Sequence, residues 1–267
     1  MKTLKALVFN VDGTLSETAE VHRLACNAAF KAAGFDFVWD AALYRDLLAI
    51  AGGRERIVHY LEHHAPPRAD EALARLDEIY AEKSRRYLHL LDEQRARLRT
   101  GVERLVGEAR SAGVRLAIAT STTLANVEAL LMACLDVDGL AAFDVIVTGD
   151  MVAEKKPSPE VYLEVLRRLD LPGRSCLAIE DSPIGVEAAA AAGIRALVTP
   201  SAYTRGMDFP GAFAVLSSLG DPFDPYDHIA GAGDADRCVT VAAIDRWLAD
   251  DDDMRALLTL GGRPVLR

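Results

Sequence analysis

This 267-residue sequence has few cysteines, no long apolar runs and no excess of positive charge. Its four cysteines lie far apart and show no Cys-x-x-Cys spacing, which excludes a redox pair or a metal knuckle. No apolar run reaches the roughly 20 residues of a membrane span, and no signal-peptide pattern opens the chain. With 30 basic against 40 acidic residues, the net charge of −10 opposes general binding to nucleic acid or anionic membranes. These absences predict a cytoplasmic protein without nucleic-acid or membrane partners, and we expect a monomer.

The composition is that of an ordinary globular protein. The hydrophobic fraction is 51% and the charged fraction 26%, which excludes a largely disordered chain. At roughly 150 residues per domain, the length predicts one large domain or a core with a smaller domain.

Five short apolar runs predict buried parallel strands, because most are nearly continuous rather than alternating. They are Leu4–Phe9, Val114–Ala119, Phe143–Val147, Ser175–Ile179 and Ala196–Val198. Helical patterns separate the later runs. Thr100 with Glu103 fits a capping box, and Ser182 with Pro183 fits a helix start. The alternation predicts an α/β fold with a Rossmann-like parallel sheet.

The stretch 16–95 differs from the rest because it shows helical patterns and no convincing strand. Its longest helical pattern runs over Asp70–Leu91. We therefore predict a core made of residues 1–15 and 96–267, with a helical cap inserted at 16–95. In the last part of the core, we expect one helix over about Val239–Ala249.

Polar residues gather where four of the predicted strands end. The stretches, in order, are Asn10-Val11-Asp12-Gly13-Thr14, Thr120-Ser121-Thr122, Lys155-Lys156-Pro157 and Glu180-Asp181-Ser182. In open α/β sheets the ligand site lies outside the carboxyl ends of the strands, so these residues should meet there. Acidic side chains are ligands for Mg²⁺, and a lysine and a hydroxyl with loop amides can hold a phosphoryl group.

These four stretches resemble, in order, the motifs of the haloacid dehalogenase superfamily of phosphotransferases, and the helical insert resembles its small cap. Within the superfamily the chain is most similar to the CbbY proteins, which hydrolyse xylulose 1,5-bisphosphate, an inhibitor of Rubisco. β-Phosphoglucomutase is a relative with the same core and cap. The supporting segments are 13–18, His22, 52–57, 149–157 and 203–205.

The resemblance implies a mechanism and a role for each motif residue. The acid at position 10 would attack phosphorus and form an aspartyl-phosphate. Asp12 would act as general acid and then as general base. Thr120 and Lys156 would stabilise charge on the phosphoryl oxygens. Mg²⁺ would be held by the side chain at position 10, the Asp12 carbonyl, Glu180 and Asp181.

The resemblance also suggests residues that bind a phosphorylated sugar. The candidates are Glu17, His22, Gly53, Arg54, Ser121, Thr122 and Arg205. Arg54 would bind the second phosphate of a bisphosphate, since the guanidinium fork suits phosphate. Two ordinary alternatives stay open: Arg54 as a solvated arginine of the cap, and His22 as a packing residue at the hinge.

Position 10 departs from the family, because it is Asn10 where the family has aspartate. An amide is a very poor nucleophile and brings no charge to a metal, so we expect this chain to be almost inactive. Either the asparagine was engineered to retain substrate, or the protein is a natural pseudoenzyme. The intact Asp12, Lys156 and Asp181 favour engineering. Three functions stay open: a sugar-phosphate phosphatase, a phosphoglucomutase-like mutase and a non-catalytic sugar-phosphate binder.

Overall fold

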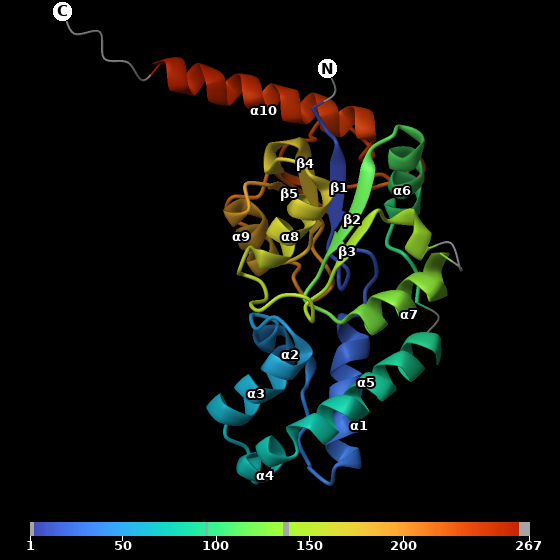
Figure 1. Ribbon diagram of the computed structural model, residues 1–267, viewed down its shortest axis with the longest axis vertical. Coiled ribbons are helices and arrows are strands. Elements are labelled where there is room, and N and C mark those ends of the chain that lie inside the picture. The colour runs from blue at the N-terminus through green and yellow to red at the C-terminus, as the bar shows by residue number, and fades with distance from the viewer. Residues whose placement is uncertain (1–2, 94–95, 136–138, 262–267) are drawn as a thin grey trace, which may run out of the picture.

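The computed structural model describes residues 3–93, 96–135 and 139–261, with side chains up to residue 253 (Figure 1). Over these residues, seven strands form one sheet in the order β3-β2-β1-β4-β5-β6-β7. Their bounds are β1 Ala6–Phe9, β2 Arg115–Ala119, β3 Val145–Val147, β4 Cys176–Glu180, β5 Arg195–Val198, β6 Ala214–Leu216 and β7 His228–Gly231. Neighbouring strands are parallel except the antiparallel pair β6 and β7. The predicted α/β fold with a parallel-sheet core is confirmed.

Helices cover both faces of the sheet, which explains why the strands β1 to β5 are nearly continuous apolar runs. Leu7 and Phe9 of β1 pack on one face, and Ala6 and Val8 pack on the other. The first face carries α6 (Val102–Ser111), α7 (Leu124–Leu135) and α10 (Val241–Gly261); the second carries α8 (Glu160–Leu169) and α9 (Pro183–Ala191). Two short 3₁₀ turns, η1 (Leu140–Ala142) and η2 (Gly173–Ser175), complete the core.

The stretch between β1 and α6 forms a helical cap below the sheet in Figure 1. Its helices are α1 (Ala19–Ala32), α2 (Ala41–Leu47), α3 (Gly53–His63), α4 (Ala69–Ala74) and α5 (Leu76–Glu93). They enclose a hydrophobic cluster of their own, which includes Phe30, Trp39 and Tyr44. The chain enters and leaves the cap side by side, since Ser16 and Leu98 form an antiparallel bridge. The division at residues 15 and 95 stays a prediction.

Three local predictions were wrong. The helical pattern Asp70–Leu91 is two helices, because α4 ends at Ala74 and α5 starts at Leu76, with Arg75 between them. Thr100 does not cap α6: Gly101 is the N-cap residue, and the Thr100 hydroxyl donates to Asp224 Oδ2 instead (3.3 Å). The last helix, α10, is longer than predicted.

Other local predictions were confirmed. The five predicted strands correspond to β1 to β5, and Ser182 caps α9 by accepting a hydrogen bond from the Gly185 amide (3.2 Å). The strands β6 and β7 were not predicted. In the part of the chain that the structure describes, no helix is long and apolar enough to cross a membrane.

Candidate active site

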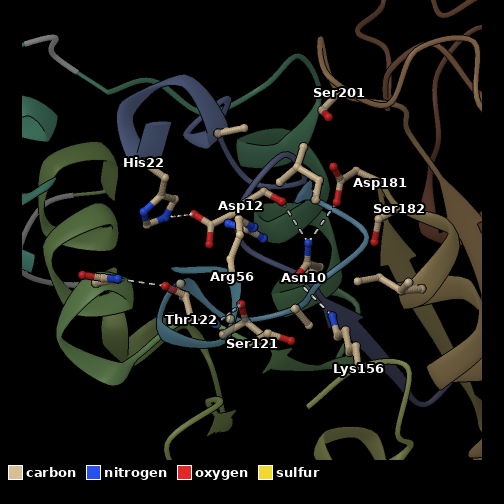
Figure 2. Close-up of a pocket in the computed structure, with 18 of the residues that line it drawn as sticks. Asn10, Asp12, His22, Arg56, Ser121, Thr122, Lys156, Asp181, Ser182 and Ser201 are labelled. Atoms are coloured by element: carbon tan, nitrogen blue, oxygen red, sulfur yellow. Dashed lines mark hydrogen bonds and ion pairs between the residues drawn. The ribbon is translucent and has the colours of Figure 1, made fainter. Parts of the chain in front are cut away.

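The polar stretches that follow β1 to β4 meet at the carboxyl edge of the sheet, next to the cap (Figure 2). Residues of the core and the cap line one pocket there. The predicted site residues that line it are Asn10, Asp12, His22, Gly53, Thr120, Ser121, Thr122, Lys156 and Asp181. The parallel strands all end at this edge, so the fold itself brings these distant residues together.

Asn10 directly follows β1, and its amide lies among the other polar groups of the pocket (Figure 2). Its Nδ2 donates to the Asp12 carbonyl (2.9 Å), to Asp181 Oδ1 (3.1 Å) and to Thr14 Oγ1 (3.2 Å). Lys156 Nζ donates to Asn10 Oδ1 (3.1 Å). Because an ammonium group can only donate, the amide oxygen has to face Lys156, and this sets the orientation of the amide.

The Asp12 carbonyl and Asp181 Oδ1 converge on one point, where the Asn10 amide donates to both. Converging oxygens fit Mg²⁺, which proteins hold through one or two carboxylates while water and phosphate complete the shell. Burial, with the neighbouring Glu180 charge, raises the pKa of Asp181 to about 7, and a bound cation would favour the ionised form. Within the described ranges, no group of three or more His, Cys, Asp and Glu side chains could hold a metal. A magnesium ion here would depend on one carboxylate, one carbonyl and a neutral Asn10.

Glu180 was predicted to hold the metal, but its two oxygens face other groups. Oε1 accepts hydrogen bonds from Lys156 Nζ (2.5 Å) and from the Tyr162 hydroxyl (2.5 Å). Oε2 lies 3.3 Å from the Asp181 backbone amide. The carboxylate is fully buried, and these donors satisfy it. The structure therefore places Glu180 as the partner that fixes Lys156, and its role as a metal ligand stays a prediction.

Asp12 is connected to the cap by a chain of hydrogen bonds. Its Oδ1 accepts from Thr18 Oγ1 (2.5 Å) and lies 3.0 Å from His22 Nε2. Lys83 Nζ of α5 lies 2.8 Å from His22 Nδ1. Since Lys83 donates to Nδ1, the ring proton sits on Nε2 and points to Asp12. The buried Lys83 and the core carboxylate are thus joined through one imidazole, which also stacks on Tyr87.

Burial and neighbouring charges set the protonation states of Asp12 and His22 in this series of hydrogen bonds. Burial, with the Lys83 charge, lowers the pKa of His22 to about 4, so the imidazole is neutral at pH 7. Burial alone would raise the pKa of Asp12. The His22 ring, the Thr18 hydroxyl and the Lys83 charge together lower it well below its usual value. Asp12 is therefore a carboxylate, which can accept a proton.

The loop after β2 offers hydroxyls and amides to the pocket. Thr120 is buried, and its Oγ1 accepts from the Thr122 amide (3.3 Å). Asn126 of α7 donates to Thr122 Oγ1 (2.8 Å) and fixes that hydroxyl. Ser121 Oγ is buried and has no hydrogen-bond partner in the structure. An unpaired buried hydroxyl beside the pocket can donate to an incoming ligand oxygen.

Three predicted substrate contacts do not line this pocket. Arg54 is on the outer side of the cap, where it pairs with Asp77 (2.6 Å). Arg205 is exposed outside the pocket. Glu17 lines a second cavity at the hinge, where it pairs with Arg99 (3.2 Å). Their predicted contact with substrate finds no support in this arrangement.

The structure adds pocket residues from the cap that the sequence reasoning did not single out: Tyr44, Arg56, Tyr80 and Lys83. Lys83 had a signal in the sequence, since it interrupts the apolar face of α5 between Ile79 and Tyr87. A lysine on a buried helix face requires a partner, and His22 provides it.

Comparison with known proteins connects this geometry to a family. The haloacid dehalogenase-like hydrolase family matches residues 4–193. The chain belongs to this family. Asn10 lies at the position of the family's nucleophilic aspartate, as the sequence predicted.

Relatives of this hydrolase include proteins called CbbY. The CbbY of Cereibacter sphaeroides is 46% identical over 218 residues, which cover 82% of this chain and 94% of that protein. The plasmid CbbY of Cupriavidus necator is 45% identical over 247 residues, 91% of this chain and 96% of that protein. A solved structure of CbbY from Rhodobacter sphaeroides has 46% identity and a TM-score of 0.74, and covers 80% of this chain and 94% of its own. That structure is of a mutant with asparagine in place of aspartate at its position 10, in complex with xylulose 1,5-bisphosphate.

Proposed function

We propose that this hydrolase has the site of a Mg²⁺-dependent sugar-bisphosphate phosphatase, with xylulose 1,5-bisphosphate as its substrate. With aspartate at position 10, the reaction would pass through an aspartyl-phosphate. With Asn10, the chain would bind the substrate and leave it unreacted.

The observation that carries the proposal is the position of Asn10. Its amide carbon lies between Lys156 on one side and the Asp12 carbonyl and Asp181 on the other. An aspartate there would have one oxygen held by Lys156 and a second oxygen facing the cation position. A carboxylate oriented in this way can attack a phosphoryl group whose charge the same cations neutralise.

The surrounding residues supply the other functions of a phosphatase. Mg²⁺, when bound, would neutralise charge on the phosphoryl oxygens. Lys156, Thr120 and the Ser121 hydroxyl would bind those oxygens from the opposite side. Asp12, as a carboxylate, can take the proton of an attacking water; bound phosphate would raise its pKa and allow it to protonate the leaving sugar oxygen.

The cap end of the pocket favours a bisphosphate. Arg56 and Lys83 bring two cationic side chains of the cap to the pocket, together with Tyr44 and Tyr80. A second phosphate is a dianion, and cations from the cap in addition to Lys156 of the core suit a substrate with two phosphates. The crystallised complex of the CbbY relative supports the same substrate for this chain.

The decisive experiment is Asn10→Asp followed by a phosphate-release assay with xylulose 1,5-bisphosphate and Mg²⁺. Removal of a catalytic nucleophile costs on the order of 10⁶ in turnover, so we expect a gain of that order. The matched control is the double variant Asn10→Asp with Asp12→Asn, which has the nucleophile but no general acid–base. Absence of activity in Asn10→Asp across a panel of phosphorylated sugars would rule out the phosphatase.

Two further measurements separate the alternative functions. A mutase would convert β-glucose 1-phosphate to glucose 6-phosphate in the presence of a bisphosphate primer, and would release little inorganic phosphate. A non-catalytic binder would bind the bisphosphate in calorimetry both with Asn10 and with aspartate, and would turn it over in neither form.

A further inference from the structure

Arg99 is a mostly buried cation in the segment that returns from the cap to the core. Only 12% of its side chain is exposed. Its guanidinium donates to the backbone carbonyls of Gly13, Thr199 (2.7 Å) and Pro200 (2.8 Å), and its Nε lies 3.2 Å from Glu17 Oε1. One planar fork therefore connects the turn after β1 with the loop after β5.

The Gly13 carbonyl belongs to the tight turn that carries the catalytic groups. Gly13 has φ +77°, and its amide donates to the Ser16 carbonyl (2.8 Å). The Thr14 amide donates to the Val11 carbonyl (3.1 Å). The turn also packs closely against Asp181, since a Cβ at Gly13 would lie 2.1 Å from Asp181 Oδ2. A small movement of this turn would displace the groups around position 10.

Loss of the guanidinium would leave the carbonyls of Gly13, Thr199 and Pro200 without this donor in a buried place. Buried carbonyls need partners, so the turn would move or admit water to regain them. The Asp12 carbonyl and the Thr14 hydroxyl lie on the same turn and contact the Asn10 amide at 2.9 and 3.2 Å. Their distance from position 10 therefore depends on Arg99.

We propose that Arg99 is a positioning residue for the reaction: through the Gly13 carbonyl it fixes the turn that aligns the Asp12 carbonyl and the Thr14 hydroxyl with position 10. This role rests on the proposed function. Lysine cannot replace it, because a single ammonium group lacks the planar fork with which the guanidinium reaches three carbonyls.

The first test needs no activity and uses the chain with Asn10. Hydrogen exchange followed by mass spectrometry compares Arg99→Gln with Arg97→Gln, a substitution at an exposed residue of the same segment. We expect exchange in the peptide spanning residues 10–16 to accelerate at least tenfold in Arg99→Gln alone, while peptides of α9 stay unchanged. Unchanged exchange in 10–16 would overturn the role of Arg99 in holding the turn.

The second test measures kinetics in the Asn10→Asp background, per folded molecule as judged by circular dichroism. Arg99→Gln and Arg99→Lys should each lower kcat at least tenfold and change KM less than about threefold, whereas Arg97→Gln should change neither. A loss of stability with normal kcat would show a purely structural role and overturn the proposal.

Chemical rescue gives a third test of the role of the Arg99 side chain. Arg99 lines a hinge cavity of about 650 Å³ together with Ser16, Leu98 and Ser218, so a small cation can reach its place. In the Asn10→Asp background, guanidinium chloride at millimolar concentration should restore part of kcat in Arg99→Ala, and sodium chloride should not. If Asn10→Asp itself is inactive, the proposed function fails, while the exchange experiment still decides whether Arg99 holds the turn.

Discussion

At the scale of single residues, the unusual feature is a neutral side chain at the centre of a charged site. Asn10 has one acceptor oxygen, and Lys156 holds it (3.1 Å). Its Nδ2 occupies the place on which the Asp12 carbonyl and Asp181 Oδ1 converge. The amide hydrogens thus satisfy the oxygens that a cation would otherwise neutralise. A metal would have to displace them, and the single amide oxygen would then have to serve both Lys156 and the metal without a negative charge.

This competition predicts that Asn10→Asp binds Mg²⁺ at least about tenfold more tightly than the chain with Asn10, a difference of roughly 1.4 kcal/mol. The added carboxylate supplies an oxygen for Lys156, another for the ion, and a negative charge. Isothermal titration with MgCl₂ measures the affinity. The matched control adds Asp181→Asn to Asn10→Asp, which should reduce the affinity again. Equal affinities with asparagine and aspartate at position 10 would contradict the competition.

The residues that could be predicted from the sequence are those fixed by strand ends. Asn10, Lys156 and Asp181 follow apolar runs, and parallel strands carry whatever follows them to the same edge. Their convergence in one pocket needs no knowledge of packing.

Residues of the cap could not be predicted in this way. Arg54 and Arg56 are two positions apart on α3, which turns their side chains to nearly opposite faces of the helix. Arg56 faces the pocket and donates to the Leu47 carbonyl (3.0 Å), whereas Arg54 pairs with Asp77 on the outside. The sequence does not show which face of α3 meets the core.

At the scale of elements, the strands β1 to β5 were predicted, whereas the short buried strand β6 and the exposed strand β7 were not. β4 is buried at every position, and its apolar run is unambiguous. β7 is exposed at every position, so its sequence has no such run. The start of α6 depended on tertiary contacts: Thr100 could have capped it, but Asp224 lies within reach of its hydroxyl (3.3 Å).

The packing of α9 on β4 gives a prediction about one glycine. A Cβ at Gly185 would lie 2.1 Å from the carboxylate carbon and Oε2 of Glu180, which is fully buried and cannot move aside. Gly185→Ala should therefore destabilise the fold by about 1–3 kcal/mol. It should also disturb Lys156, which Glu180 holds. Urea unfolding measures the change.

The matched control is Gly107→Ala in α6, where an added Cβ would meet no atom within 4 Å. There the substitution should stabilise the protein by about 0.5–1 kcal/mol, because alanine loses less entropy in a helix. Similar effects at both positions would show that Glu180 does not constrain α9.

At the scale of the whole molecule, the pocket exists only where the cap meets the core. Apart from the hinge, apolar and polar contacts join the two parts. Tyr87 and Leu91 of α5 belong to the same buried cluster as Val127 and Leu130 of α7. Lys155 of the core pairs with Glu55 of α3 (2.5 Å), and the Tyr203 hydroxyl donates to Glu20 of α1. Tyr203 also packs edge-on against Tyr44 (5.5 Å between ring centres). The described arrangement is therefore a cap held against the core.

The Lys155–Glu55 pair predicts how easily the cap opens. Glu55 is 45% exposed and Lys155 is 21% exposed, and such pairs contribute at most about 1 kcal/mol. Glu55→Gln should therefore raise the open population by no more than roughly fivefold. Energy transfer between dyes attached at Val38 of the cap and Leu163 of the core, both exposed, measures this population. High salt should reproduce the effect in the unaltered chain, because it screens an exposed pair.

The matched control is Glu78→Gln, since Glu78 pairs with Arg75 inside the cap (2.8 Å) and does not reach the core through that pair. It removes the same charge from the same cap and should leave energy transfer unchanged. An equal change in both variants would assign the effect to the net charge of the cap, because of these two glutamates Glu55 pairs with the core and Glu78 pairs within the cap. A cap that stays closed in Glu55→Gln and at high salt would mean that other contacts hold it, such as those of Tyr203 and the packing of α5 against α7, and that Lys155 has no part in closure.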